Sequence, residues 1–240
     1  MATALTTVTP TTLRITRIGQ AELVVRNAEK VAEFLFRFDP SSVADYSYDV
    51  WIARQIDPDR FSTEDVEVMN RTMAARSPYA AWGGLVGRDL PWLSAIDRGS
   101  DLFRLGDLDW SVTRGHIEAA LKAMVGKHRN LAVVTKMLHM KRPRLIPLCD
   151  SYVQQQVLGC VLSQAPPEAL ASSGMDLIDH LRAQGKRNLD GLLAVQEHLA
   201  ARGIERTLVR ILDLLLWSSY EGARWHMLEP LLAEWFGTEA

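Results

Sequence analysis

The sequence predicts an all-α protein of ten or so helices, for three reasons. The 240-residue chain is 48% apolar and 23% charged, a composition that supports a substantial buried core and excludes global disorder. Apolar residues recur at helical spacing along most of the chain, often just after a Ser, Asn or Asp that can cap a helix. Only residues 13–18 alternate convincingly as a strand would. We therefore expect a single compact α-helical domain over residues 13–240, as one unit or as two packed helical lobes, with room for one short N-terminal strand.

The N-terminal half of the chain is divided by composition and capping signals. Residues 1–12 are rich in threonine, with no basic start and no long apolar run, so we expect a flexible terminus rather than a signal peptide. Residues 13–18, LRITRI, fit a short strand that is too isolated to build a sheet. Apolar periodicity predicts a helix over residues 21–38, and Ser62 caps a predicted helix that runs through residue 76. The tract 78–110, punctuated by glycine and aspartate, is expected to contain short helices joined by turns.

The C-terminal half reads as a succession of helices. The predicted segments run from Ser111 or Thr113 to near Val125, from Asn130 to Lys141, from Asp150-Ser151 onward, and over residues 167–184, 189–201, 206–220 and 228–236. The segment 206–220, RTLVRILDLLLWSSY, is apolar nearly all round and is expected to lie at the centre of the molecule. A buried Asp213 would need a partner such as Arg210 or a lysine, and would serve as an internal strut or as a second carboxylate of a pocket.

Charge is distributed unevenly along the chain. Residues 114–144 carry eight Lys and Arg against one acid, Glu118, for a local charge of +7 in a chain whose net charge is −2. Such asymmetry fits an anionic ligand or a nucleic-acid backbone better than a membrane surface.

Several classes of protein are excluded by the sequence. No uncharged apolar run approaches the roughly 18 to 20 residues that span a bilayer, so we expect a cytoplasmic protein with no membrane partner. Cys149 and Cys160 lack the spacing of a zinc site or a disulfide framework. Glu221, His226 and Glu229 lack the helical spacing of a metalloprotease motif, and no phosphate-binding loop or GxSxG element is present. We expect no metal and no cofactor; the sequence leaves the oligomeric state open.

The stretch 134–153, VTKMLHMKRPRLIPLCDSYV, concentrates the candidate chemistry. On a helix that starts near Asn130, the apolar residues fall on one broad arc, and Lys136 and His139 lie beside it as neighbours at i and i+3. Pro143 and Pro147 then enforce an extended link. Asp150 follows at the start of the next helix, where a capping carboxylate accepts backbone N–H bonds and usually stays ionised.

This order of a basic helix, a proline-bearing link and an aspartate at a helix start resembles the helix-hairpin-helix DNA glycosylases. The hairpin before the basic helix keeps one glycine, Gly126, in place of the tight GxG turn of that superfamily. The chain also resembles an uncharacterised bacterial family with a KxLHxKRPxLxPxxDS signature, here residues 136–151, an upstream TEDVEVMN element at residues 63–70 and a downstream RxLDxLLW element at residues 210–217. This second resemblance covers most of residues 45–217 and implies no activity.

The glycosylase resemblance implies roles for particular residues. Asp150 would stabilise the cationic charge that develops on the sugar or orient a water molecule, Lys136 would attack the sugar or offset phosphate charge, and His139 would position a phosphate or carry a proton. The expected backbone contacts are Lys127, Arg129, Lys141, Arg142 and Arg144, and the expected stacking partners of an extruded base are Trp82, Trp110, Trp217 and Tyr220.

We therefore expect a protein that binds DNA or another nucleic acid and resembles DNA glycosylases. The activity that this resemblance implies is hydrolysis of the N-glycosidic bond of a modified or damaged base, with Asp150 as the catalytic residue. Two alternatives remain open at this point. The same scaffold would serve as a non-catalytic helical module that binds DNA or RNA through its basic segment. It would also serve as an enzyme or resistance protein that acts on a small anionic metabolite.

Overall fold

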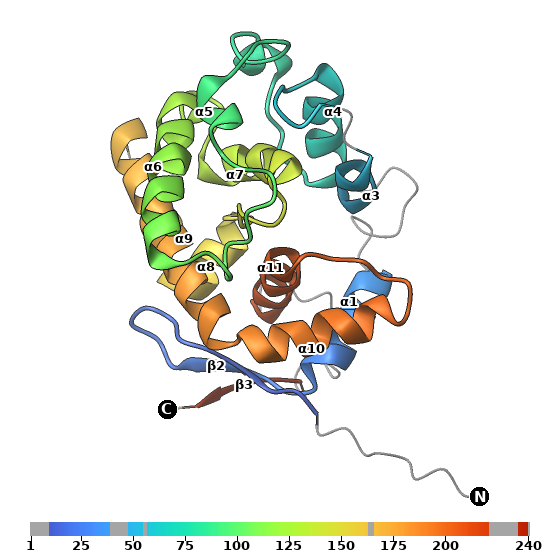
Figure 1. The fold of residues 1–240 in the computed structure, drawn as a ribbon. Helices are drawn as coiled ribbons and strands as arrows, with labels where there is room; N and C mark the ends of the chain where they lie inside the picture. Colours follow the sequence, from blue (N-terminus) through green and yellow to red (C-terminus); the bar gives the residue numbers. More distant parts are fainter. Residues whose placement is uncertain (1–9, 39–47, 55–56, 163–165, 221–234, 240) are drawn as a thin grey trace, which may run out of the picture.

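The computed structural model describes residues 10–38, 48–54, 57–162, 166–220 and 235–239. Within these residues the chain is mostly helical, as predicted, and it also contains a small three-stranded sheet. In Figure 1 the sheet lies at one end of the molecule, next to α9 (Pro167–Arg187) and α10 (Leu189–Ala200). Most of the predicted flexible terminus lies outside the described residues. Within the described part of that terminus, the backbone N–H of Thr11 donates to Glu29 and its carbonyl accepts from Ala28; the flexibility of residues 1–12 stays a prediction.

The sheet corrects two predictions about the ends of the chain. Its antiparallel strands are β1 (Leu13–Ile15), β2 (Glu22–Val25) and β3 (Phe236–Glu239), in the order β1-β2-β3. The strand predicted over residues 13–18 therefore has partners, and residues 22–25 form its neighbour instead of the first turn of a helix. The sequence ELVV favours a strand, and Asn27 with a φ of 51° separates it from the helix that follows. The helix predicted over residues 228–236 lies mostly outside the described residues, and Phe236 belongs to β3.

The edge of β1 is held by side chains from the end of α9. The backbone N–H of Thr16 donates to Gln184 Oε1 at 2.9 Å, and that of Arg14 donates to Asn188 Oδ1 at 2.9 Å. Both donors would otherwise be exposed on a free strand edge. Segments from the two ends of the chain thereby build one layer beneath the helices (Figure 1).

Most helix boundaries follow the capping signals in the sequence. The capping box of Ser62 and Asp65 opens α4, which ends at Thr72 rather than Arg76 because Ala74 and Arg76 have positive φ. The helix predicted from Ser111 or Thr113 begins earlier, after Gly106. The tract 78–110 contains short helices, as expected. The remaining helices are α1 (Ala28–Phe38), α3 (Tyr48–Ala53), η1 (Tyr79–Trp82), α5 (Pro91–Ser94), α6 (Asp107–Met124), α7 (Leu131–Lys141), α8 (Ser151–Leu158) and α11 (Leu208–Ser219), with α4 spanning Thr63–Thr72.

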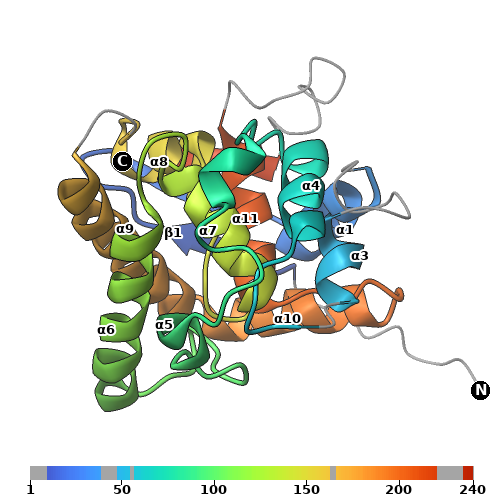
Figure 2. The same ribbon diagram turned by 90° about the horizontal axis from the view of Figure 1, so that it is seen from above.

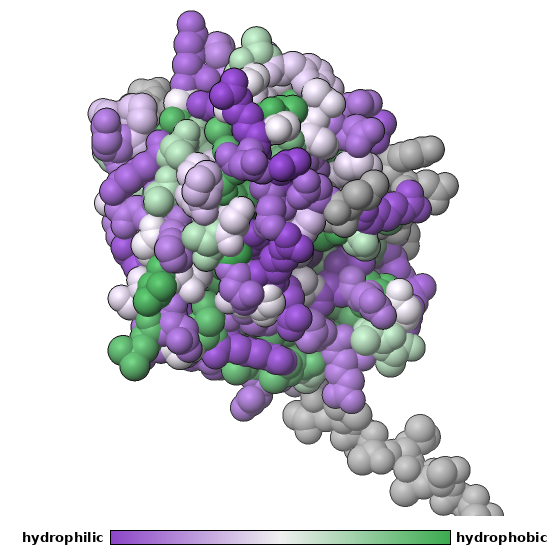
Figure 3. All heavy atoms as spheres, turned by 45° about the horizontal axis from the view of Figure 1, so that its top comes forward, coloured by the Kyte–Doolittle hydropathy of each residue, from purple (hydrophilic) through white to green (hydrophobic). Residues whose placement is uncertain are grey.

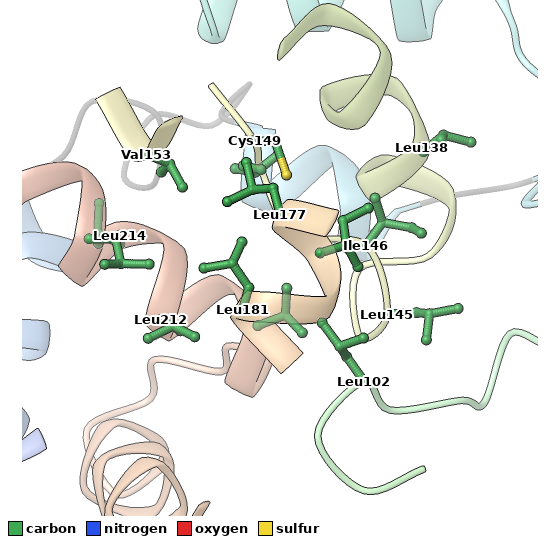
Figure 4. Packing of buried hydrophobic residues seen from close by; sticks show 14 of the residues in the cluster. Leu102, Leu138, Leu145, Ile146, Cys149, Val153, Leu177, Leu181, Leu212 and Leu214 are labelled. Atoms are coloured by element: carbon green, nitrogen blue, oxygen red, sulfur yellow. The ribbon is translucent and has the colours of Figure 1, made fainter. Parts of the chain in front are cut away.

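Helix α11 lies at the centre of the helical assembly, as its composition predicts. Nearly all of its residues are buried, and it packs against α1, α8, α9 and α10. Figure 2 shows α11 between α7 and α1 when the molecule is viewed from above. In Figure 4, Leu212 and Leu214 of α11 lie among buried residues of α8, α9 and the segment that joins α7 to α8. The outer surface is different: hydrophilic side chains cover most of the face in Figure 3. None of the described helices is both long and apolar enough to span a bilayer.

Helix α9 approaches its neighbours closely at two glycines. A Cβ atom at Gly174 would lie 2.6 Å from Leu131 Cδ1 of α7, and one at Gly185 would overlap the ring of Phe103. The Phe103 ring is 2% exposed, so surrounding atoms leave it little room to move. Glycine at these positions therefore sets the distance between α9 and the rest of the core.

We predict that Gly185→Ala lowers the free energy of unfolding by about 1–3 kcal/mol, because overpacking a close-packed core forces the ring and the backbone to shift. Gly115→Ala is the matched control. Gly115 is exposed within α6 and nothing lies within 4 Å of an added Cβ, so the better helix propensity of alanine should raise stability by up to ~1 kcal/mol. Urea denaturation of both variants checks this, and equal stability of the two would contradict the close approach.

Candidate functional site

A short hairpin joins α6 to α7. The backbone N–H of Gly126 donates to the carbonyl of Arg129 at 3.0 Å, and that of Arg129 donates back at 2.9 Å. His128 adopts a φ of 65° in this turn, the left-handed conformation that favours glycine. Asn130 then caps α7 by accepting from Val133 N–H at 3.0 Å, as predicted. The hairpin fixes where α7 begins.

The link between α7 and α8 is buried, and its backbone groups bond to side chains of the surrounding helices. Residues 143–149 form neither helix nor strand, as expected of a segment with two prolines. A buried backbone polar group without a partner is costly, so each needs a donor or acceptor nearby. The contacts are Cys149 N–H to Thr135 Oγ1 at 3.1 Å, Leu148 N–H to Asp213 Oδ2 at 2.9 Å, His139 Nδ1 to the Ile146 carbonyl at 2.5 Å, and Thr207 Oγ1 to the Pro143 carbonyl at 2.9 Å.

The link delivers Asp150 to the wall of a cavity of about 600 Å³. This volume lies within the range of about 300–1,000 Å³ that is typical of small-molecule sites. The cavity is bounded by α7, α8, α11 and the connection after α4. Its polar and aromatic lining residues include Lys136, Asp150, Tyr152, Arg210, Asp213 and Trp217. Two of the three predicted catalytic residues, Lys136 and Asp150, therefore share one cavity with one of the predicted stacking residues, Trp217.

Asp150 caps α8, as predicted. Its Oδ1 accepts from the backbone N–H groups of Tyr152 and Val153, both at 3.0 Å. Burial nevertheless raises the pKa of this carboxyl above its ordinary value, while the charge of Lys136 and the two N–H bonds act in the opposite direction. Ionisation of Asp150 is therefore less favourable than that of an exposed capping residue, and Lys136 is the main group that opposes this effect of burial.

Lys136 faces the cavity from α7 and is only 8% exposed. Its Nζ donates to the Met73 carbonyl at 2.9 Å. Burial lowers the pKa of the ammonium, and the nearby Asp150 raises it. Lys136 and Asp150 thus stabilise each other's charged form inside the cavity.

The connection that supplies Met73 has an unusual backbone. Ala74 and Arg76 both have positive φ, at 49° and 51°. Non-glycine residues in this conformation cost energy and are concentrated at functional sites. Both residues line the cavity, and Ser77 then donates to the carbonyl of His128 at 3.0 Å, which joins this connection to the hairpin.

The two carboxyl oxygens of Asp213 have different surroundings. Its Oδ2 accepts from Leu148 N–H, so the strut predicted for it is present, although the partner is the link rather than Arg210. Arg210 instead binds Asp49 with Nε at 3.0 Å and Nη2 at 3.2 Å. Among the described residues, Asp213 Oδ1 has no hydrogen-bond partner. Burial raises the pKa of Asp213 to about 8, so the carboxyl is protonated at neutral pH.

The structure places His139 outside this cavity, which corrects its predicted role. The imidazole is fully buried, stacks on Tyr48 and bonds to the Ile146 carbonyl through Nδ1. Because the carbonyl can only accept a hydrogen bond, Nδ1 carries the proton and Nε2 is unprotonated. Burial lowers the pKa to about 4. A neutral, buried ring cannot hold a phosphate, so His139 is a structural residue of the link.

The basic segment does not form a continuous cationic surface. Lys141 and Arg142, predicted to contact a nucleic-acid backbone, are buried, and we correct that prediction: Lys141 pairs with Asp65 at 2.7 Å, and Arg142 pairs with Asp59 at 2.8 Å. Arg144 is half-exposed, with Asp101 at 3.8 Å. Arg129 donates to the Ala81 carbonyl at 2.7 Å. Lys127 is exposed on the hairpin, and its role as a backbone contact stays a prediction.

The predicted stacking residues divide between the cavity and the core. Trp82 and Trp110 are buried and donate to Ser77 at 2.9 Å and Asp179 at 2.8 Å, so neither is available to a base. Tyr152, which the sequence reasoning missed, also lines the cavity. Its ring lies 5.8 Å from Trp217 and 5.3 Å from Tyr220, centroid to centroid. The feature of the sequence that could have identified Tyr152 as a cavity residue is its position two residues after Asp150.

The described residues contain no group of three or more His, Cys, Asp or Glu side chains that could hold a metal ion. The C-terminal residues Glu221, His226 and Glu229 lie outside the described residues.

We predict that His139→Asn makes the free energy of unfolding less dependent on pH between pH 6.5 and 4. The side-chain amide of asparagine can still donate to the Ile146 carbonyl, so the hydrogen bond is kept. The folded-state pKa of His139 is about 4, below its ordinary value of 6.5, so unfolding takes up a proton between these values. The wild type should therefore lose stability as pH falls from 6.5 to 4, at up to about 1.4 kcal/mol per pH unit. Denaturant melts at several pH values measure this. His116→Asn, the same substitution on α6, is the control. An acid-side slope in His139→Asn no flatter than in this control would contradict the burial of His139.

Comparison with known proteins gives a family and no activity. No match was found among curated proteins or among solved structures. A family model matches residues 28–220, from α1 through the end of α11, and so includes the link and every element that lines the cavity. The chain therefore belongs to DUF6308, a family of unknown function.

Proposed function

We propose that this protein hydrolyses the N-glycosidic bond of a nucleotide that is extruded from DNA into the cavity between α7, α8 and α11. The observation that carries the proposal is that Lys136 and Asp150, from consecutive helices, line one cavity with Trp217. The hairpin at Gly126, the helix α7, the proline link and the capping Asp150 follow one another in the order of the helix-hairpin-helix glycosylases.

The central chemical requirement is a negative charge near the sugar. As the C1′–N bond breaks, positive charge develops on the sugar ring, and a carboxylate close to C1′ lowers the energy of that transition state. Asp150 meets this requirement because its Oδ1 is fixed by two backbone N–H groups while its charge is supported by Lys136. Asp150 is buried, so its electrostatic effect is larger than that of a carboxylate at the surface.

The aromatic residues support a bound base. Trp217 and Tyr152 both line the cavity, and their rings meet edge to face with an interplanar angle of 68°. An extruded base needs a flat apolar surface to replace the stacking it loses in the duplex. Tyr220 stacks behind Tyr152 and holds that ring in place.

Exposed cations beside the cavity support binding of the backbone. Arg76 lines the cavity and is exposed, and Lys127 is exposed on the hairpin that Ser77 ties to the same connection. Neither residue forms an ion pair with any other described residue. Most of the other cations between residues 114 and 144 pair with carboxylates, so backbone contact falls to this smaller area. Phosphate contacts of this kind position a duplex without reading its sequence.

We predict that Asp150→Asn abolishes excision while the variant still folds and binds DNA, because asparagine caps a helix nearly as well as aspartate. The assay incubates purified protein with duplexes that carry alkylated, oxidised or deaminated bases, and with free nucleosides. Loss of a stabilising charge at this buried position should lower the rate by at least ~10²-fold. Asp190→Asn, an exposed acid in the first turn of α10, is the control and should keep full activity.

The opposite results separate the alternatives. If the wild type binds duplexes and releases no base from any of them, the protein is a binding module. Cleavage of free nucleosides without affinity for duplexes would assign a small-molecule substrate instead. Absence of both binding and cleavage at low salt would remove the proposal altogether.

We further predict that Lys136→Gln moves the acid limb of the pH–rate profile to higher pH. Lys136 lowers the pKa of Asp150, so without its charge the carboxylate needs a higher pH to ionise. The measurement is the single-turnover excision rate across pH, with Lys122→Gln as the control on the surface of α6. Borohydride trapping should give no covalent product, because Lys136 acts here through Asp150. A trapped protein–DNA adduct that Lys136→Gln eliminates would instead make Lys136 the nucleophile.

A further inference from the structure

We infer that Asp213 is the proton donor to the departing base, and that Asp150 and Asp213 form an acid–base pair across the cavity. Since this inference rests on the proposed function, it adds a second catalytic residue to the same site. Asp213 is 2% exposed, comes from the central helix α11 and lines the same cavity as Asp150.

Within the part of the chain that the structure describes, hydrogen bonds occupy one of the two carboxyl oxygens of Asp213. Its Oδ2 accepts from Leu148 N–H at 2.9 Å, which fixes the orientation of the carboxyl group. Its Oδ1 has no hydrogen-bond partner among the described residues. A strut needs one oxygen only, and a buried polar atom left unsatisfied costs free energy. Oδ1 is closed to solvent on a residue that lines the cavity, so a base that binds there and moves the covering side chains would supply the missing partner.

The surroundings of Asp213 keep it protonated. Its neighbours on α11, Leu212 and Leu214, are buried and apolar. The charged groups that act on it are Arg210 of α11, Asp49 of α3 and Asp150 at the start of α8, and Lys136 of α7 faces the same cavity. Arg210 is engaged by Asp49, which leaves burial as the dominant effect on the pKa of Asp213, at about 8. The group can thus donate a proton at neutral pH.

The two carboxyl groups differ in the way that acid–base catalysis requires. Asp150 accepts two backbone N–H bonds and has Lys136 beside it, whereas Asp213 accepts one N–H bond and forms no ion pair with a cation of the described part of the chain. Similar side chains whose environments separate their pKa values commonly divide into an acid and a base. Asp150 is the base of this pair and Asp213 is the acid.

The resulting step is balanced with water as the only co-reactant. The C1′–N bond breaks, its electron pair goes to the base, and the Oδ1–H of Asp213 supplies a proton to a ring nitrogen of that base. Water adds to C1′, and Asp150 accepts the proton that the water loses. The products are a free base and a sugar with a hydroxyl at C1′. Proton exchange with solvent then restores both carboxyl groups.

The test compares two leaving groups in Asp213→Asn. A neutral purine such as hypoxanthine is a poor leaving group until a ring nitrogen is protonated, so its excision should fall by about 10²–10⁴-fold. A cationic alkylated purine already carries positive charge, so its excision should fall by less than about tenfold. In the wild type, excision of the neutral base should decline above pH 8, and this decline should be absent from the variant. Asp190→Asn is the control, since that carboxylate is exposed on α10.

Several results would overturn the assignment. An equal loss on both leaving groups would mean that Asp213 only supports the structure, and no loss on either would remove it from the reaction. A readout without turnover is the infrared difference spectrum between wild type and Asp213→Asn at pH 7, which should contain the C=O stretch of a protonated carboxylic acid. Its absence overturns the inference even if the protein cleaves DNA. If this C=O stretch is present and the protein cleaves no substrate, Asp213 is protonated but the proposed function is wrong.

Discussion

The candidate site depends on one constraint, the need of the buried link between α7 and α8 to satisfy its backbone hydrogen bonds. Pro143 and Pro147 prevent the link from joining a helix or a sheet, so its polar groups need side-chain partners. They find them on three helices, in Thr135 and His139 of α7, Gln154 of α8 and Asp213 of α11. These contacts fix the position at which α8 begins. Asp150 faces the cavity because side chains up to 63 positions away in the chain hold the preceding link in place.

Buried cations perform a similar structural task at the C-terminal end of α7, directly before the link. Arg142 is 1% exposed and donates to the carbonyls of Pro58, Leu93 and Ile96, all at 2.6–2.7 Å. A guanidinium suits this position because its several N–H groups can reach different loops at once. Lys141 next to it forms a buried pair with Asp65 of α4. The cluster that looks like a ligand-binding surface in the sequence is instead what attaches two loops and a helix to the end of α7.

The sequence alone predicts the structure correctly where a local signal determines it. Asn130, Asp150 and Ser62 each cap a helix where predicted, and the apolar composition of α11 identifies it as central. The sequence alone does not predict the structure of segments whose conformation depends on residues far away in the chain. The strand β2 forms because β1 and β3 lie on either side of it, and β3 comes from the opposite end of the chain. A helical wheel places His139 beside the core, but only the path of the link, which passes over that face, makes the ring buried and neutral.

The charges inside the cavity constrain which part of a substrate can occupy it. Lys136 and Asp150 offset each other, Arg210 is paired with Asp49, and Asp213 is neutral at pH 7. Among the residues that line the cavity, these groups leave little net charge for a phosphate to neutralise, and burying an unpaired phosphate would be costly. The exposed Arg76 at the edge is better suited to that group. Under the proposed function a neutral base and its sugar would occupy the interior, where ionisation of Asp150 and protonation of Asp213 favour each other, because two carboxylates in one low-dielectric site resist ionising together.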